Sequence, residues 1–224
     1  MKRRHFNALI SSLCALAAAG SLGNALAQAP AQTASSKLPV VLVVGDSLSA
    51  EYGLKRGTGW VALMSEAMAK ENVKARVVNA SISGDTTSGG RSRIAALLKQ
   101  HRPEWVVIEL GGNDALRGLP LTGTRDNLAT MARLSREAGA KVLLLGMEMP
   151  PNYGSKYAQE FRALYTTVAK SEKTALVPFF LKGVADIADP TALFQNDRIH
   201  PNEKAQSTMR DNVWPELRKL IARR

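Results

Sequence analysis

The sequence predicts an α/β fold, in which a central five-stranded parallel sheet is flanked by helices. Five short aliphatic runs recur along the chain, and polar or glycine residues bound each of them. Stretches with helical periodicity separate the runs. A strand followed by a helix, repeated five times, gives a parallel sheet whose connecting helices cover both faces.

The five predicted strands are residues 39–44, 75–79, 105–110, 141–147 and 175–178. Each run is short and rich in valine, leucine or isoleucine, without the alternation of apolar and polar residues that marks a half-exposed strand. We therefore expect strands that are buried on both faces, as in a parallel sheet between two helical layers.

Apolar residues spaced three or four apart predict a helix in each of four segments between the strands. Their stripes are Trp60, Leu63, Met64, Ala67 and Met68, then Ile94, Leu97 and Leu98, then Leu128, Met131, Leu134 and Ser135, and then Phe161, Leu164, Tyr165 and Val168. A final helix is expected from about Pro201, with Ala205, Met209, Val213, Leu217 and Ile221 on its apolar face. We expect Pro215 to kink or restart that helix.

Residues 1–27 resemble an export leader. Lys2, Arg3 and Arg4 precede an apolar stretch at 9–19, and Ala25-Leu26-Ala27 fits a cleavage site. The stretch is shorter than the ~20 residues of a spanning helix, which argues against an uncleaved anchor. We expect a periplasmic or secreted protein, with the Sec and Tat routes both open. Residues 28–37 would form a flexible arm and residues 38–224 a single domain.

Composition limits the classes of partner. The chain has 30 basic and 19 acidic residues, and without the leader 27 basic residues remain, for a net charge of +8. The lysines and arginines are scattered and only 5% of residues are aromatic, so we expect no nucleic acid partner. We expect at most weak association with an anionic membrane surface, and no obligate protein partner is evident. Cys14 is the only cysteine and lies in the leader, which excludes disulfides and a thiolate nucleophile from the processed chain. A lipoprotein cysteine at this position is disfavoured because Leu13 precedes it.

Polar residues follow three of the predicted strands at their carboxyl ends, where ligands bind in open α/β sheets. Ser47 is a candidate nucleophile in the first of these loops, and it needs a base to accept its proton. His200 follows the last strand and can reach the same edge, whereas His101 enters the third strand from the opposite edge. Asp197 precedes His200 by three residues, and its carboxylate could keep the His200 imidazole in one tautomer.

The remaining loops offer hydrogen-bond donors for an oxyanion. Gly84 would let the backbone N–H approach a ligand, Asn113 carries a neutral amide, and the Ser47 N–H is a third donor. Each residue also has a purely structural interpretation. Gly84 could be a turn glycine, and Asn113 with Asp114 could cap the following helix. The coincidence of all of these residues at one edge favours ester chemistry.

The blocks VVGDSLSAEYG, NASISGDTTSGG, VIELGGNDALRG and NDRIHPNEKAQ resemble those of the GDSL, or SGNH, hydrolases, in particular their envelope arylesterase branch. The resemblance spans about residues 39–217. It implies a three-layer flavodoxin-like fold with a shallow cleft, and no metal or organic cofactor. It also implies a Ser47, Asp197 and His200 triad, an oxyanion hole of Ser47, Gly84 and Asn113, and acyl ester, thioester or lysophospholipid substrates.

Two other functions remain open from the sequence. The same triad could remove acetyl groups from a carbohydrate or polysaccharide, although few aromatic residues are present to stack on sugars. A non-catalytic anion-binding module would lack a glycine-rich phosphate motif and would leave Asp197 and His200 without a role.

Two loops at the same edge are candidate walls for an acyl chain. The loop at residues 147–154 follows the fourth strand, and residues 116–121 could face it. From these loops we expect substrate contacts by Leu116, Met149, Pro150, Asn152 and Tyr153. The alternative is that both are surface loops that pack on the sheet.

Overall fold

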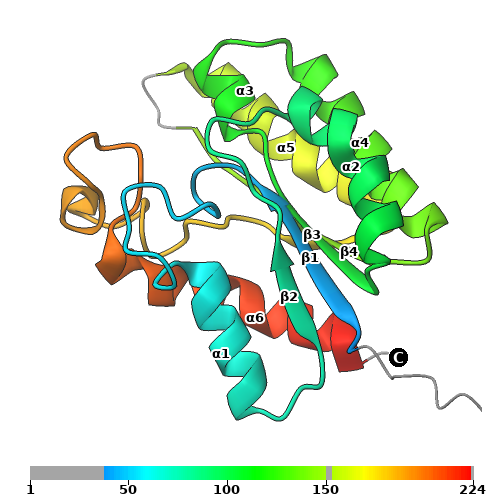
Figure 1. Cartoon of the computed structure of the whole chain (residues 1–224). Coiled ribbons are helices and arrows are strands. Elements are labelled where there is room, and N and C mark those ends of the chain that lie inside the picture. Colours follow the sequence, from blue (N-terminus) through cyan, green and yellow to red (C-terminus); the bar gives the residue numbers. More distant parts are fainter. Residues whose placement is uncertain (1–37, 150–152, 223–224) are drawn as a thin grey trace, which may run out of the picture. The chain divides into compact units, whose positions relative to one another are not determined.

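The computed structural model describes residues 38–149 and 153–222. The predicted leader and arm, and the residues Pro150 and Asn152, lie outside this part. A parallel sheet of five strands, in the order β2-β1-β3-β4-β5, forms its centre and confirms the predicted fold class (Figure 1). The strands are β1 (Val40–Gly45), β2 (Arg76–Asn79), β3 (Trp105–Glu109), β4 (Lys141–Leu145) and β5 (Ala175–Val177).

Helices cover both faces of the sheet, as the alternating pattern predicts (Figure 1). One layer contains α2, α3, α4 and α5, and the other contains α1 and α6. The helices are α1 (Trp60–Lys70), α2 (Thr87–His101), α3 (Gly112–Leu116), α4 (Leu121–Glu137), α5 (Ser155–Ser171) and α6 (Gln206–Ala222), with short 3-10 helices at Pro190–Leu193 and Glu203–Ala205. None of the described helices is long and apolar enough to cross a membrane.

The three central strands are almost entirely buried, but the edge strands are not. All six residues of β1 and all five of β3 are buried, whereas β2 is exposed at both ends and β5 is half-buried over two of its three residues. The expectation of burial on both faces is therefore wrong for β2 and β5, because each of them has a neighbouring strand on one side only.

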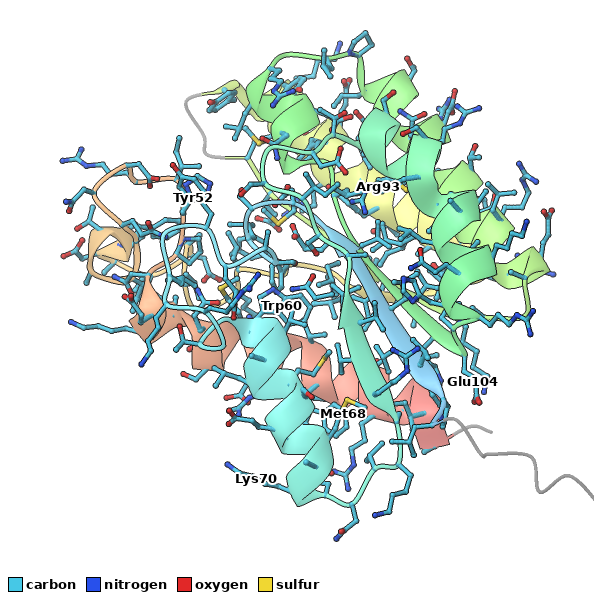
Figure 2. The ribbon with its side chains drawn as sticks, in the orientation of Figure 1. Tyr52, Trp60, Met68, Lys70, Arg93 and Glu104 are labelled. Carbon is cyan, nitrogen blue, oxygen red and sulfur yellow. The ribbon has the colours of Figure 1, made fainter. Side chains whose placement is uncertain are left out.

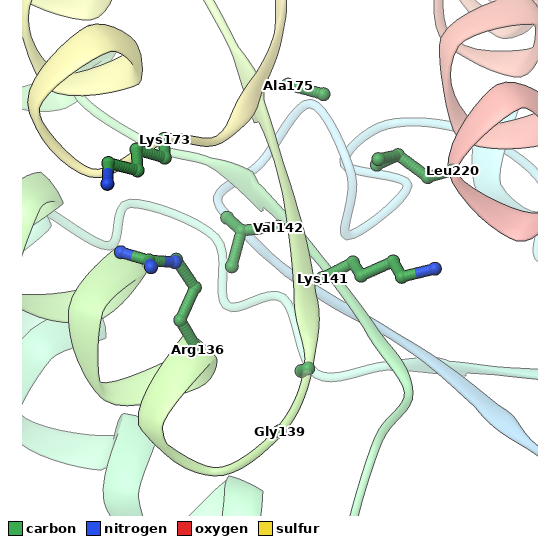
Figure 3. A pocket seen from close by; sticks show the side chains of 8 residues that line it. Arg136, Gly139, Lys141, Val142, Lys173, Ala175 and Leu220 are labelled. Carbon is green, nitrogen blue, oxygen red and sulfur yellow. The ribbon is translucent and has the colours of Figure 1, made fainter. Parts of the chain in front are cut away.

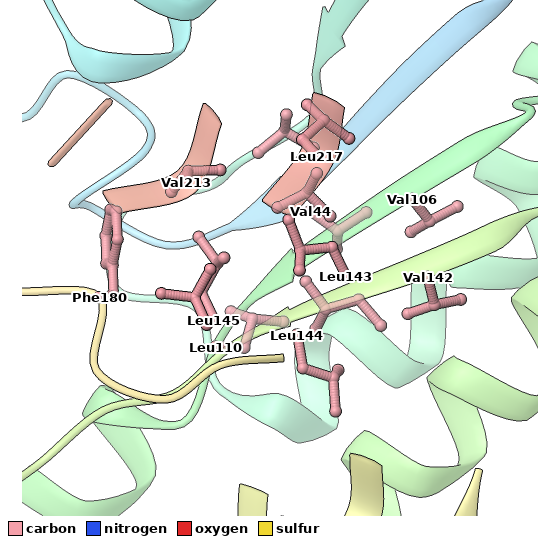
Figure 4. Packing of buried hydrophobic residues seen from close by; sticks show 14 of the residues in the cluster. Val44, Val106, Leu110, Val142, Leu143, Leu144, Leu145, Phe180, Val213 and Leu217 are labelled. Carbon is pink, nitrogen blue, oxygen red and sulfur yellow. The ribbon is translucent and has the colours of Figure 1, made fainter. Parts of the chain in front are cut away.

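The core between the sheet and α6 is continuous. Figure 4 shows Val213 and Leu217 of α6, together with Phe180, close to apolar side chains of the sheet. The final helix begins at Gln206, five residues later than the sequence predicts, and it continues through Pro215 as one helix to Ala222. Val44 of β1 belongs to this core, and the polar residues begin two positions later at Asp46.

Candidate active site

The nucleophile candidate lies on a tight turn at the carboxyl end of β1. The carbonyl of Asp46 accepts hydrogen bonds from the N–H groups of Ser49 and Ala50, at 3.3 and 2.9 Å. A Cβ at Gly45 would lie 2.7 Å from the Ser49 hydroxyl oxygen, so the turn needs a glycine at this position. The buried strand and this turn leave Ser47 9% exposed at the edge of the sheet.

Ser47, His200 and Asp197 form a continuous chain of contacts. His200 Nε2 lies 2.9 Å from Ser47 Oγ, and His200 Nδ1 lies 2.7 Å from Asp197 Oδ2. Since the carboxylate can only accept at neutral pH, Nδ1 carries the proton and Nε2 is free to accept from the serine hydroxyl. The sequence expectation that these three residues meet at one edge agrees with these distances.

Asp197 is held by the loop that carries His200. Its Oδ1 accepts from the N–H groups of Ile199 and His200, at 2.9 and 3.0 Å. The hydrogen bond from the His200 N–H, followed by the bond to the His200 ring, lowers the pKa of Asp197 to about 2. The carboxylate therefore stays ionised across the neutral range and can stabilise a protonated imidazole.

Two residues that the sequence analysis missed support His200. The ring of Tyr52 lies on the imidazole, with 4.4 Å between the ring centroids. Gln195 Nε2 donates to the Tyr52 carbonyl at 2.8 Å, and the Gln195 N–H donates to the His200 carbonyl at 2.8 Å. Gln195 thus connects the loop after β1 to the loop after β5, and it fixes the imidazole relative to Ser47. The sequence carries no signal for this pair, because 143 positions separate the two residues.

His101 lies at the other end of the sheet, as the sequence predicts. It is the last residue of α2, and β3 begins only four residues later at Trp105. Since the strands are parallel, this position is at the edge opposite to the carboxyl ends that carry Ser47 and His200.

Three candidate oxyanion donors surround the Ser47 turn. Gly84 has a φ of +78°, which favours glycine. The N–H groups of Gly84 and Ser47 donate to no acceptor within the described residues. Asn113 Nδ2 donates to Asp46 Oδ2 at 3.0 Å. Helix α3 begins at Gly112 with Gly111 as its N-cap residue, so Asn113 is not its cap. The capping interpretation of Asn113 is therefore wrong, and its amide is directed toward the nucleophile turn.

Arg93 links the nucleophile strand to the loop that carries Gly84 (labelled in Figure 2). Its side chain is 18% exposed, and its Nη2 forms an ion pair with Asp85 at 2.7 Å. It also donates to the carbonyl of Ala80 and, at 3.4 Å, to that of Gly45. A single guanidinium thus joins the ends of β1 and β2 to the loop that follows β2.

Asp46 and Glu109 form a buried carboxylate pair beside the site. Glu109 Oε2 accepts from the Ser49 hydroxyl at 2.7 Å and from the Asp46 N–H at 3.3 Å, while its Oε1 has no partner within the described residues. Burial, and then the charge of Asp46, raise the pKa of Glu109 well above its ordinary value. Burial also raises the pKa of Asp46 to about 6. We infer that the pair holds one proton at neutral pH, on Glu109, because two adjacent buried carboxylates cannot both ionise cheaply.

The expected acyl-binding residues differ in exposure. Leu116 and Tyr153 are 43% and 41% exposed, whereas Met149 is buried. The Tyr157 hydroxyl donates to the Ala115 carbonyl at 3.5 Å, which brings α5 close to α3. Leu116 and Tyr153 are thus available to a substrate, and Met149 instead belongs to the packed layer beneath the loop.

A cavity of about 230 Å³ lies away from these residues. Arg136, Lys141 and Lys173 line it together with Val142 and Leu220, at the edge where β4 and β5 begin (Figure 3). Since Ser47 lies at the opposite edge, this cavity is not part of the candidate active site. Among the described residues, no cluster of three or more histidines, cysteines or acids could hold a metal ion.

The buried pair predicts a pH dependence of stability. Glu109 is protonated in the fold but ionises in the unfolded chain above its ordinary pKa of 4.5, so folding takes up a proton. The free energy of unfolding should therefore fall as pH rises above 4.5, by about 1.4 kcal/mol per pH unit over which only the folded chain holds this proton. In Glu109→Gln the fall should be smaller, because an amide does not titrate.

Urea denaturation at several pH values measures this difference. Glu137→Gln, the same change at an exposed glutamate of α4, is the matched control and should keep the wild-type slope. Equal slopes in the wild type and Glu109→Gln would contradict the assignment of the proton to Glu109.

Comparisons with known proteins agree with the geometry. A family model described as GDSL-like lipase/acylhydrolase matches residues 43–207. Esterase TesA of Pseudomonas aeruginosa is 52% identical over 194 residues, which cover 87% of this chain and 92% of that protein. Thioesterase 1/protease 1/lysophospholipase L1 of Escherichia coli K12 is 41% identical over 181 residues, which cover 81% of this chain and 84% of that protein.

Solved structures show the same fold. The crystal structure of TesA has a TM-score of 0.78 and 53% identity, covering 81% of this chain and 99% of its own. The structure of psychrotrophic esterase EstA from Pseudoalteromonas sp., inhibited by monoethylphosphonate, has a TM-score of 0.76 and 38% identity. The match covers 82% of this chain and 98% of that chain. The resemblance noted in the sequence is confirmed, and the chain belongs to the GDSL-like lipase/acylhydrolase family.

Proposed function

We propose that this hydrolase cleaves acyl esters and thioesters through an acyl-enzyme on Ser47, with His200 as general base and Asp197 as the third member of the triad. The observation that carries the proposal is the unbroken chain of contacts, 2.9 Å from Ser47 Oγ to His200 Nε2 and 2.7 Å from His200 Nδ1 to Asp197. These are the distances at which a base can take a hydroxyl proton and a carboxylate can stabilise the resulting imidazolium.

The reaction proceeds in two steps. In the first, Ser47 Oγ attacks the acyl carbon while His200 Nε2 takes the hydroxyl proton, and the tetrahedral intermediate then expels the alcohol or thiol, which receives that proton. In the second, water attacks the acyl-enzyme with His200 again as base, and the acid leaves as the Ser47 hydroxyl is restored. The exposed carboxylate of Asp197, with its low pKa, keeps the imidazole oriented through both steps.

The oxyanion of each intermediate would bind to the N–H groups of Ser47 and Gly84 and to the Asn113 amide. The two backbone N–H groups have no other acceptor within the described residues, which supports this role. Asn113 has two amide hydrogens, so the bond to Asp46 leaves one for the substrate. Because the Asp46 carboxylate can only accept, it also fixes which end of the Asn113 side chain faces the site.

We propose small acyl esters, thioesters and lysophospholipids as the substrate class. The names of the Pseudomonas and Escherichia relatives, an esterase and a thioesterase with lysophospholipase activity, support this range. The exposed side chains of Leu116, at the end of α3, and of Tyr153, before α5, lie at the Ser47 edge and would contact the acyl chain. Hydrolysis of p-nitrophenyl butyrate and an acyl-CoA tests the proposal, and acetate release from acetylated polysaccharide alone would favour a carbohydrate esterase instead.

The two histidines of the described chain should differ sharply when replaced. His200→Ala removes the general base, so kcat on a simple aryl ester should fall by about 10⁴- to 10⁶-fold. His101→Ala is the matched control at the opposite edge of the sheet and should change kcat less than about twofold. Circular dichroism first shows that both variants are folded, and steady-state kinetics then compares their kcat values. Similar losses in the two variants would remove His200 from the mechanism.

The Asn113→Ala variant should show whether the Asn113 amide has a catalytic or only a structural role. If the amide stabilises the oxyanion, its bond strengthens in the transition state, so kcat should fall by roughly 10²- to 10³-fold with little change in KM. Asn212→Ala is the matched control, because Asn212 Nδ2 donates to the carbonyls of Phe180 and Lys182 away from Ser47. It should lower the free energy of unfolding and leave kcat nearly unchanged. A folded Asn113→Ala variant with near wild-type kcat would exclude Asn113 from the oxyanion hole.

A further inference from the structure

The charges of the molecule are separated between the two edges of the sheet. In a parallel α/β fold the helices run opposite to the strands, so helix ends and strand beginnings share one edge. We define the amino edge as the last four residues of α1, α2, α4, α5 and α6, the segments that lead into β2 to β5, and the first residue of each of these four strands. It holds ten cations, Lys70, Lys74, Arg76, Lys99, Arg102, Arg136, Lys141, Lys170, Lys173 and Lys219, against four carboxylates, Glu71, Glu104, Glu137 and Glu172.

The opposite edge has the opposite balance. We define the carboxyl edge as the segments from the end of each strand to the next long helix. It holds six cations, Lys55, Arg56, Arg117, Lys182, Arg198 and Lys204, against nine carboxylates, Asp46, Glu51, Asp85, Asp114, Glu148, Asp186, Asp189, Asp197 and Glu203. In Figure 2, Lys70 and Glu104 mark the amino edge and Tyr52 lies at the carboxyl edge.

The cations of the amino edge are accessible. Nine of the ten are exposed and Lys141 is half-buried. Lysines and arginines in the last turn of a helix often serve only to offset the helix dipole. That explanation does not apply to Lys74, Arg76 and Lys141, which lie beyond the helices. The helix dipole therefore does not explain the whole excess of positive charge at this edge.

Apolar groups lie among these cations. The cavity of about 230 Å³ has Arg136 and Lys173 beside a floor that includes Val142, Ala175 and Leu220 (Figure 3). Leu38, which precedes β1 at this edge, is 47% exposed. The exposed aromatic residues Tyr52 and Tyr153 both lie at the other edge, so among the described residues the amino edge has no exposed tyrosine, phenylalanine or tryptophan to stack on a base. Cations mixed with aliphatic groups match a lipid surface better than a nucleic acid.

We propose that the amino edge docks on an anionic phospholipid surface. The attraction is electrostatic, since each lysine or arginine near such a surface contributes separately and salt screens all of them. The carboxyl edge has no comparable excess of cations, so the bound molecule is oriented with Ser47 facing the water. A corollary, which rests on the proposed function, is that the docked enzyme takes dissolved esters, thioesters and lysophospholipids rather than lipids of the bilayer beneath it.

Vesicle binding with charge-matched variants tests the proposal. Lys74→Gln/Arg76→Gln/Lys173→Gln removes three cations from the amino edge, and Lys55→Gln/Arg56→Gln/Lys182→Gln removes three from the carboxyl edge. The protein is recovered from expressing cells, with its N-terminus sequenced so that all variants are compared in the same processed form. Sedimentation with vesicles of phosphatidylcholine, or of phosphatidylcholine with about one-third phosphatidylglycerol, measures the partition constants.

The wild type should bind only the anionic vesicles and be released at about 0.5 M salt. The amino-edge variant should bind about tenfold or more weakly, and the carboxyl-edge variant should bind within about threefold of the wild type. Equal losses in the two variants would show that net charge, and not an edge, is responsible, and would overturn the proposal. So would binding to phosphatidylcholine alone, or tighter binding to duplex DNA than to anionic vesicles.

A probe of orientation gives a second, independent measurement. In a Cys14→Ser background, an environment-sensitive fluorophore on Gln100→Cys at the amino edge should shift to the blue on anionic vesicles. The same fluorophore on Thr122→Cys, near the start of α4 at the carboxyl edge, should not shift. The reverse pattern would overturn the proposed orientation. Activity on p-nitrophenyl butyrate should be unchanged in both triple variants, so a failure of docking and a failure of the esterase proposal remain distinguishable.

Discussion

The carboxylate of Asp46 is the contact on which the arrangement of the site depends. Its Oδ1 accepts from the Leu48 N–H at 3.0 Å, and its Oδ2 accepts from the Asn113 amide at 3.0 Å. The first bond shapes the turn that carries Ser47, and the second connects that turn to α3. Because Asp46 is 2% exposed, neither bond competes with water. Ser47 and the Asn113 amide, the proposed nucleophile and oxyanion donor, therefore keep one relative position, set by one buried acid.

That arrangement has an electrostatic cost, and the surrounding residues limit it. A second acid, Glu109, is fully buried beside Asp46, and it takes a proton because a second charge there would be too costly. Ser49 links the pair to the core, since its hydroxyl donates to Glu109 and accepts from the Trp60 indole N–H at 3.2 Å. Arg93 holds the adjacent loop by an ion pair and backbone contacts. Polar groups that are bonded to one another thus surround the largely buried Ser47.

The sequence predicted the sheet, the layers and the contacts of Ser47 with His200, because those follow from local periodicity and from the parallel topology. It did not predict the exposure of β2 and β5, since strand order is not encoded in the composition of a strand. Asn113 was open to a capping interpretation because asparagine is a common cap. The structure instead places Gly111 at the cap. Arg93, Gln195 and Tyr52 were missed because their contacts join distant loops. The sequence does contain an indication of Glu109, because an acid ends the apolar run VVIE.

A developing oxyanion should meet three hydrogen-bond donors held around Ser47. A crystal structure of the protein inactivated by an alkyl phosphonate tests it most directly, since the phosphoryl oxygen stands in for the oxyanion of the tetrahedral intermediate. We expect a covalent bond from Ser47 Oγ to phosphorus, and a phosphoryl oxygen about 3 Å from the N–H nitrogens of Ser47 and Gly84 and from Asn113 Nδ2. An adduct on Ser49 or Ser83, or a phosphoryl oxygen turned away from these three nitrogens, would contradict it.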